Sequence, residues 1–543
     1  MRFFKHLRAR SRNKNAANKS AFKKYQVAQP AAYYYPPPPF DCTKRLPQQV
    51  LARIFSFVCP HALDESYDTS EESMSTDGCM LCDMRDLAHC ALVCKRWYTP
   101  AQSLLYQHVR IDAVHYCELE IELSSKRKKG AFVDRHGKPI DVTQMRLLLF
   151  MRTVRESPQL GNKVLSLRMP YMTREASKTD LARTISVLPN LRYVDLPVGF
   201  FSDDISSFPL KQELMARCPD IRRMSYTHGS EGSFARIPNT GVWPKLEILE
   251  LTDLRVEEST LRLVVFSLQS LRSLKLDRMD SIGDSLFTPS QSLPPFPPLQ
   301  RLALHETPNI TANGLARYIS IPRTADLLTE LVLSNTGVHP AYLYQFIPQA
   351  TRLRHFTIEA QVDRSFPPEN IPPLTSKSIK TMHYEITSPN TPPGVQPASS
   401  SYYSYLVTSL LSNCLPTVRK LYVLDANFPD ALLFTPPPLR PFADGNNNNS
   451  WNLAQGLQQP LDLYSKGMDE LEWSFTQFDA TAFGRRRCSV TRPASFHEAQ
   501  LGSRWGGESR ESILVGNGFG GYLAVPVNEG RPKSSSGRID LFR

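Results

Sequence analysis

The stretch LQRLALHETPNITANGLARYISIPRTADLLTELVL, residues 299–333, contains the same apolar pattern at both ends. The pattern is an apolar residue, two residues of any kind, a second apolar residue, one of any kind and a third apolar residue. It occurs eight times, at start positions 191, 221, 246, 271, 299, 328, 353 and 379. The starts lie 25 to 30 residues apart, and at about this period each repeat supplies one strand and one helix. The chain is therefore predicted to have a repetitive α/β fold.

The segments between the patterns support this interpretation. Apolar residues follow helical spacing in 261–268 and 315–319, and several strands are entered through a Pro-containing turn, as in 188–191. A strand–helix unit cannot bury its own apolar face, so the units must stack. We expect a curved solenoid with a parallel inner sheet over residues 161–476, with Pro-, Ser- and Asn-rich insertions at about 386–404 and 435–460. Weaker matches are found at Leu165 and Leu167, at 418–423 and at 468–473.

Residues between the core positions of each strand point to the concave face of such a sheet, because side chains alternate along a strand. This face mixes both charge signs, and we expect neither an aromatic ladder nor a run of basic residues on it. A protein or peptide ligand therefore fits better than a nucleic acid, although most of these positions are equally well explained as solvated surface. The candidates are Tyr193, Arg223, Glu250, Lys275, Arg301, Glu330, His355 and His383.

Three short amphipathic helices are predicted near the N-terminus. The first follows Pro47, with Val50, Leu51, Ile54, Phe55 and Val58 on one face. The second starts at Asp86 as N-cap, with Leu87, Cys90, Ala91, Cys94 and Trp97 on one stripe. The third starts at Pro100, and 108–111 is predicted to be a strand. These helices are too short to bury a core alone, so another surface must cover them.

The motifs LPQQVL (46–51), IF (54–55), DL (86–87) and LVCKRW (92–97) resemble an F-box. An F-box at 42–112 followed by a short strand and leucine-rich repeats resembles the substrate receptors of cullin–RING ubiquitin ligases. Residues 299–319 resemble the cysteine-containing class of these repeats, with Glu306 or Thr307 in place of the cysteine. Gln49 stands where the family often has Glu, and about 25 residues, 59–85, replace the usual short loop between the first two helices.

The resemblance implies a non-catalytic substrate-recognition subunit without a cofactor. Its F-box would bind a Skp-type adaptor, and through it the cullin and RING subunits, while the repeats would bind a protein substrate. The alternative is a scaffold or regulator with the same two parts that does not direct degradation. The adaptor-binding positions implied by the motif are Leu46, Pro47, Val50, Leu51, Ile54, Phe55, Leu87, Val93 and Trp97.

The insertion 59–85 is acidic and rich in Ser and Thr, a composition that suits phosphorylation by an acid-directed kinase but is also common in inert loops. It offers one weak zinc set, Cys59, His61, Cys79 and Cys82. Thiolates and imidazole suit zinc, but a single CxxC without a second pair is weak evidence. Cys90 and Cys94 are better explained as core residues. We therefore predict no metal, and a redox or metal-dependent module at Cys79 and Cys82 stays the third hypothesis.

Composition limits the remaining possibilities. The 543 residues carry a net charge of +12, and residues 1–24 hold nine Lys or Arg and no acid. The segment 1–41 is expected to be a disordered basic and Pro-rich tail, which is an import signal, a presequence or an extension. Residues 113–160 are expected to be a helical connection with a basic loop. No apolar run is long enough to span a bilayer, so we expect a cytoplasmic or nuclear protein with no membrane and no nucleic-acid partner.

The C-terminal extension, 477–543, contains the glycine-rich stretch GNGFGG at 516–521. This stretch lacks the lysine and the following helix of a phosphate-binding loop, so a turn is the better interpretation. No Ser-His-Asp set or carboxylate pair can be assembled from the sequence spacing. The sequence therefore offers no candidate catalytic site.

Overall fold

The computed structural model divides the chain into two compact units, residues 1–51 and 52–543. It describes residues 42–59, 62, 64–72, 80–111, 142–202, 204–368, 371–389, 396–434, 457–468, 470–479, 512–516 and 522–526. The predicted N-terminal tail, the basic loop 126–129 and residues 517–521 lie outside this set. No helix within the described ranges is both long and apolar enough to cross a membrane.

The first helices begin near Pro47. A short 3-10 helix, η1 (Cys42–Arg45), precedes α2 (Gln48–Ser56), which spans the boundary between the two units. The carbonyl oxygen of Pro47 accepts hydrogen bonds from the backbone N–H groups of Val50 and Leu51, at 3.1 and 3.2 Å. Proline suits this position because the first N–H groups of a helix have no intrahelical partner.

The next two helices differ from the predicted ones. Helix α3 (Met80–Val93) starts before Asp86, which is therefore an interior residue and not an N-cap. Cys94 has extended backbone angles (φ −160°, ψ 164°) and ends the helix, so Trp97 belongs to α4 (Lys95–Gln107) and not to the stripe of Leu87. Pro100 lies inside α4 and does not start a helix.

A three-stranded parallel sheet follows, in the order β1 (His108–Arg110), β2 (Ser166–Arg168) and β3 (Tyr193–Val194). The helices between its strands are α6 (Val142–Glu156), α7 (Pro158–Gly161), α8 (Tyr171–Ala176) and α9 (Lys178–Ile185). Val164, Leu167 and Met169 are fully buried. The expected core position Leu167 is therefore confirmed, whereas Leu165 was wrong, because Val164 is the first buried residue of this pattern.

The main sheet has ten strands whose spatial order follows their sequence order. All neighbours are parallel except the last pair, which is antiparallel. The strands are β4 (Arg223–Thr227), β5 (Ile248–Thr252), β6 (Ser273–Asp277), β7 (Arg301–His305), β8 (Glu330–Ser334), β9 (His355–Gln361), β10 (Thr381–Thr387), β11 (Lys420–Val423), β12 (Leu461–Ser465) and β13 (Ser474–Phe478). The backbone N–H of Arg222 donates to the carbonyl oxygen of Arg192 at 2.8 Å and links this sheet to β3.

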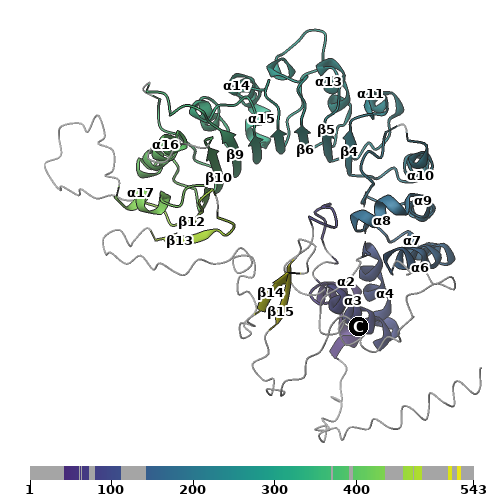
Figure 1. Ribbon diagram of the computed structural model, residues 1–543. Helices are drawn as coiled ribbons and strands as arrows, with labels where there is room; N and C mark the ends of the chain where they lie inside the picture. The colour runs from purple at the N-terminus through teal and green to yellow at the C-terminus, as the bar shows by residue number, and fades with distance from the viewer. Residues whose placement is uncertain are drawn as a thin grey trace, which may run out of the picture. The chain divides into compact units, whose positions relative to one another are not determined.

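Helices cover one face of the main sheet, and among the residues that the structure describes none lies on its other, curved face (Figure 1). We call this second side the concave face. The covering helices are α10 (Phe208–Arg217), α11 (Glu231–Ala235), α12 (Ile237–Thr240), α13 (Glu258–Ser267), α14 (Ala312–Ile319), α15 (Pro322–Leu327), α16 (Ser399–Leu411) and α17 (Phe428–Phe434). Short 3-10 turns add η3 (Ile205–Ser207), η4 (Asp284–Phe287), η5 (Pro340–Gln345) and η6 (Ile347–Gln349). The chain therefore has a mixed α/β fold with a mainly parallel sheet.

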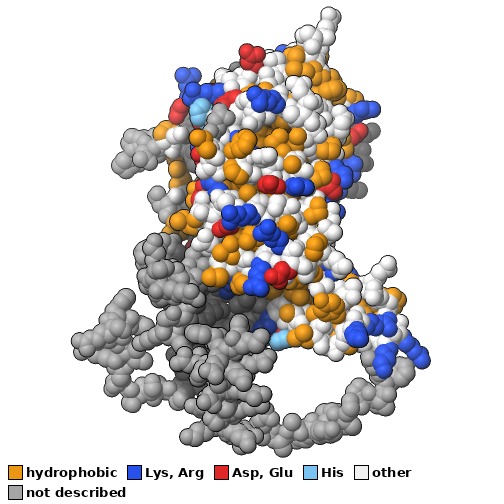
Figure 2. Space-filling model, turned by 90° about the vertical axis from the view of Figure 1, so that its right-hand side faces the viewer, with side chains coloured by type: hydrophobic (Ala, Val, Ile, Leu, Met, Phe, Trp, Pro, Cys, Tyr) orange, Lys and Arg blue, Asp and Glu red, His pale blue; other side chains and the backbone are white. Residues whose placement is uncertain are grey.

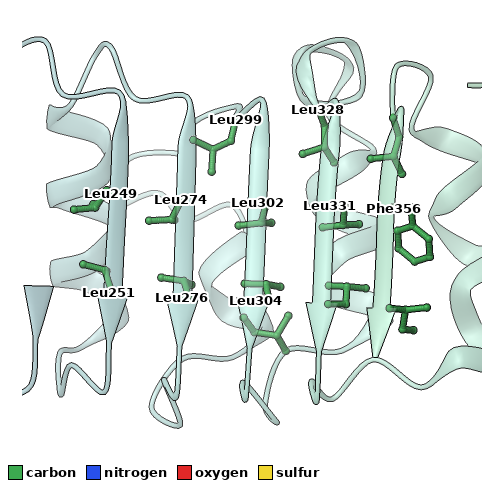
Figure 3. Packing of buried hydrophobic residues seen from close by; sticks show 14 of the residues in the cluster. Leu249, Leu251, Leu274, Leu276, Leu299, Leu302, Leu304, Leu328, Leu331 and Phe356 are labelled. Atoms are coloured by element: carbon green, nitrogen blue, oxygen red, sulfur yellow. The ribbon is translucent and has the colours of Figure 1, made fainter. Parts of the chain in front are cut away.

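The core lies between the sheet and its helices. Leu249, Leu274, Leu302, Leu331 and Phe356 are in register on successive strands and are completely buried, as Figure 3 shows. Side chains at this period-two spacing all reach the same face. The buried side chains of each strand thus pack against those of the next strand, which gives one continuous hydrophobic cluster from Val109 to Phe478.

The turns after four consecutive strands share a backbone feature. Asp253, Arg278, Glu306 and Asn335 directly follow β5 to β8 and have φ values of 50°, 52°, 46° and 50°. In each of these turns, the N–H donates to a carbonyl oxygen of the next strand, as Asp253 does to Asp277 at 2.8 Å. The left-handed conformation is costly for residues with a Cβ. Glu306 and Thr307 were the two candidates for the position of the repeat cysteine, and of these Thr307 is buried.

The C-terminal part departs from the expected repeat. Met468 and Leu471 are 57% and 93% exposed, so the apolar match at 468–473 was wrong. Leu461 and Leu463 of β12 fill the core instead, and β13 pairs with β12 in the opposite direction. Beyond it, β14 (Ser512–Gly516) and β15 (Tyr522–Pro526) form an antiparallel pair on either side of the glycine-rich stretch, which does not lead into a helix.

Candidate functional site

Large apolar side chains are exposed on and beside the N-terminal helices. In the second unit these are Ile54, Phe57, Leu92, Val93 and Tyr98, with exposed fractions of 45%, 68%, 80%, 62% and 48%. Val50, one helical turn before Ile54 on α2, is 41% exposed. A concentration of exposed apolar residues on short helices marks a surface for a partner.

A second group of residues from the same motif is buried. Leu51, Phe55 and Leu87 are at most 2% exposed, and the Phe55 ring centroid lies 5.1 Å from that of Trp97 at a tilted angle. These side chains stabilise the helices and are not accessible to a partner. The nine adaptor-binding positions implied by the motif therefore fall into three groups by exposure. Three are buried, two are half-buried (Leu46 and Trp97), and four are exposed (Pro47, Val50, Ile54 and Val93).

Residues 43–112 match the family described as F-box-like. The chain thus contains an F-box-like domain. No curated protein matches the chain. Within the F-box-like domain, residues 57–79 separate α2 from α3. Part of this connection, residues 64–72 (DESYDTSEE), contacts the first strands of the sheets, and we call it the acidic segment.

Three of the predicted concave residues lie at these contacts. Tyr193 is 3% exposed, and its hydroxyl donates to Asp195 Oδ1 at 2.6 Å. Arg223 Nη2 donates to both carboxylate oxygens of Glu250, at 2.9 and 3.1 Å. Burial raises the pKa of Tyr193 well above its ordinary value, and the neighbouring carboxylate of Asp195 adds to this effect. Tyr193 is therefore a neutral hydrogen-bond donor at physiological pH.

The other predicted concave residues lie on the middle strands. Arg301 Nε and Glu330 Oε1 are 3.2 Å apart on the adjacent strands β7 and β8. Lys275 is half-buried and His355 is exposed. Exposed ion pairs of this kind contribute little to stability, so these residues give the face polarity without forming a defined site.

A row of aromatic rings crosses the C-terminal strands of the concave face. The rings of His383 and Tyr422 stack at 4.0 Å with an interplanar angle of 9°, and those of Tyr422 and Tyr464 stack at 4.5 Å and 8°. Trp473 and Phe475 flank the row. The expectation of no aromatic ladder was wrong. Strand alternation would have predicted it. Leu421 and Val423 face the core, as do Leu461 and Leu463, so Tyr422 and Tyr464 must face the concave side.

One further face of the molecule mixes residue types. Figure 2 shows the face on the right-hand side of Figure 1, where hydrophobic and charged side chains are interspersed and opposite charges lie next to each other. Scattered exposed hydrophobic residues are normal on soluble domains. The candidate surfaces are therefore the F-box-like helices and the concave face.

The expectation that the weak zinc candidates hold no metal stays a prediction. His61 and Cys79 lie outside the described residues, and only the backbone of Cys82 is described, in α3. Cys59 is buried. No cluster of three or more His, Cys, Asp or Glu able to hold a metal occurs among the residues that the structure describes. Cys94 is exposed at the junction of α3 and α4, so its assignment to the core was wrong, and Cys90 is half-buried.

Proposed function

We propose that the chain is the substrate-recognition subunit of an SCF-type ubiquitin ligase. The F-box-like domain would bind a Skp-type adaptor and, through it, the cullin and RING subunits. The match of residues 43–112 to the F-box-like family supports this assignment. F-box proteins are typically non-catalytic adaptors, and proximity is what such a subunit contributes, because it turns a slow encounter into a local one.

We further propose that the units of 25 to 30 residues are leucine-rich repeats that bind a protein substrate. The regular register of the buried leucines, the sequential parallel strands and the helices on one face support this proposal. The concave face then offers the polar residues of β4 to β9 and the aromatic row for contacts with a substrate.

The exposed apolar side chains on and directly after α2 and on α3 are the observation that carries the adaptor proposal. Burying one side chain of this kind fully contributes about 1.5 to 3 kcal/mol. Ile54, Phe57, Leu92 and Val93 are largely exposed in the chain on its own, so this free energy is available to a partner. Leu51 is unsuitable for a test because it is buried and a charge there would unfold the helices.

The test is capture of a purified Skp-type adaptor by the full chain and by the double variant Ile54→Asp/Val93→Asp. Two charges in an apolar interface should cost at least about 3 kcal/mol, which weakens binding by more than about 100-fold. The matched control is Val198→Asp/Ile205→Asp, because these residues are 66% and 88% exposed and lie outside the F-box-like domain. Equal capture by wild type and the F-box variant would refute the proposal.

A further inference from the structure

The acidic segment fills a site built by the first repeats. Arg168 of β2 is almost completely buried, and its Nη1 lies 2.9 Å from Asp64 Oδ2. Its Nε donates to the carbonyl oxygen of Asp68 at 2.9 Å. One guanidinium thus binds a carboxylate and a backbone carbonyl of the same segment, which is the planar, two-pronged recognition that favours arginine over lysine.

Two further arginines bind the other end of the segment. Arg174 Nη2 of α8 lies 3.1 Å from Glu71 Oε2. The other carboxylate oxygen, Glu71 Oε1, accepts a hydrogen bond from the backbone N–H of Tyr171 at 2.8 Å. Arg223 Nη1 of β4 donates to the carbonyl oxygen of Tyr67 at 2.6 Å and to Glu72 Oε2 at 3.2 Å. The three arginines come from three separate elements and converge on nine consecutive residues.

The backbone of the segment is also bound. The N–H of Ser70 donates to Asp195 Oδ2 at 3.1 Å, and its carbonyl oxygen accepts from Arg110 Nη2 at 3.0 Å. The Tyr67 ring centroid lies 6.2 Å from that of Tyr193. Thr69 and Glu72 exchange hydrogen bonds between side chain and backbone, at 3.0 and 3.2 Å, and so shape the turn without help from the repeats.

Burial is unequal on the two sides of this contact. The side chains of Arg168, Arg174 and Arg223 are 4%, 9% and 10% exposed. The side chains of Asp64, Asp68, Glu71 and Glu72 are 27%, 46%, 48% and 55% exposed. With the segment in place the arginines are thus covered, whereas the acidic side chains of its C-terminal half stay partly in water.

We propose that Arg168, Arg174 and Arg223 form a binding site for an extended acidic peptide, and that the acidic segment is a tethered ligand that occupies this site in cis. An acidic segment of a substrate competes with the tethered one. This inference names the ligand class of the receptor proposed above and rests on that proposal for its biological role. Peptide binding itself does not require the adaptor.

Tethering sets the expected competition. A ligand that belongs to the same chain as its binding site is presented at an effective concentration on the order of 1 mM. If the isolated peptide binds the open site with a Kd of about 0.1 mM, the cis segment occupies about nine-tenths of the molecules. The apparent affinity for a free peptide is then reduced about tenfold, and release of the segment restores it.

The experiment measures binding of a labelled peptide, DESYDTSEE, to the full chain by fluorescence anisotropy. The test variant is Asp64→Asn/Glu71→Gln/Glu72→Gln, which weakens the cis ligand and leaves the arginines intact. The matched control is Glu65→Gln, because Glu65 is exposed and makes no ion pair with any residue that the structure describes. We expect about tenfold tighter binding to the triple variant than to wild type or the control, and loss of that binding on adding Arg223→Gln.

A second measurement uses the wild-type chain and so does not depend on the folding of a variant. Excess peptide should increase hydrogen exchange at the amide of Ser70, which donates to Asp195 while the segment is seated. Equal, weak binding to all variants together with unchanged exchange would overturn the inference and make the segment a permanent part of the fold. Adaptor capture by the same proteins separates this failure from failure of the proposed function, because that assay does not involve the arginines.

Discussion

His108 lies where the F-box-like domain leads into the first strand, and it is 4% exposed. Its Nδ1 is 2.9 Å from Ser166 Oγ, while Nε2 is buried and has no hydrogen-bond partner within the described part of the chain. Burial lowers the pKa of His108 to about 4, and the nearby charge of Arg168 contributes to the shift. The folded protein thus holds this imidazole neutral at a pH where the unfolded chain already protonates it.

The free energy of unfolding should therefore fall as the pH decreases from about 6.5 towards about 4. In this window the unfolded state binds the proton that the folded state excludes, and the loss reaches about 3 kcal/mol. His108→Gln removes the titrating group, so its pH dependence should be flatter over this interval. Urea titrations of both proteins at pH 7 and 4.5 measure the difference, and parallel curves would contradict the assignment.

At the scale of single elements, the turn after β8 shows how tightly neighbouring repeats pack. The N–H of Gly337 donates to the carbonyl oxygen of Thr307 at 3.2 Å. A Cβ at Gly337 would lie 2.1 Å from the carbonyl oxygen of Pro308 and 2.8 Å from that of Ile310. Only a residue without a side chain allows this approach of two turns.

Gly337→Ala should consequently destabilise the protein by about 2 to 3 kcal/mol, because backbone atoms cannot move aside as a flexible side chain can. Gly232→Ala is the matched control, since a Cβ there meets no atom within 4 Å inside α11. It should stabilise by up to about 1 kcal/mol through its better helix propensity. Chemical denaturation of both variants tests the contrast, and equal effects would argue against the close approach.

Elements with strict periodicity could be predicted from the sequence, and those without it could not. The strands at Leu249, Leu274 and Leu302 follow from the spacing of leucines because each position faces the same core. The break between α3 and α4 at Cys94 has no signal in the sequence, because the apolar residues on both sides of it follow helical spacing. Contacts of tertiary structure decide such boundaries, and local propensity does not.

At the scale of the whole molecule, stability in a stacked array depends on contacts between neighbouring units. Leu302 of β7 is completely buried between β6 and β8, and Leu302→Ala should cost about 2 to 5 kcal/mol. Hydrogen exchange should increase at β6, β7 and β8 and stay unchanged at β11 and β12. A uniform loss of protection across all strands would instead indicate a single cooperative unit.

The site on the first repeats illustrates what the sequence could not show. Arg223 could be named from strand alternation, but Arg168 and Arg174 could not be connected with Asp64 and Glu71, about 100 residues earlier in the chain. No repeat or motif encodes a contact between an insertion and a strand. The excess of Asp and Glu in the insertion could be seen in the sequence. Which basic residues bind these carboxylates is revealed only by the fold.

The reversed direction of β13 also bears on the behaviour of the protein in concentrated solution. A sheet that ended after the nine parallel strands β4 to β12 would present an open edge. Such an edge can pair with a strand of a second copy. Because β13 runs antiparallel to β12, the polarity of the ladder ends at that edge. A second copy that added its parallel strands in the same register would therefore not continue the ladder at this edge.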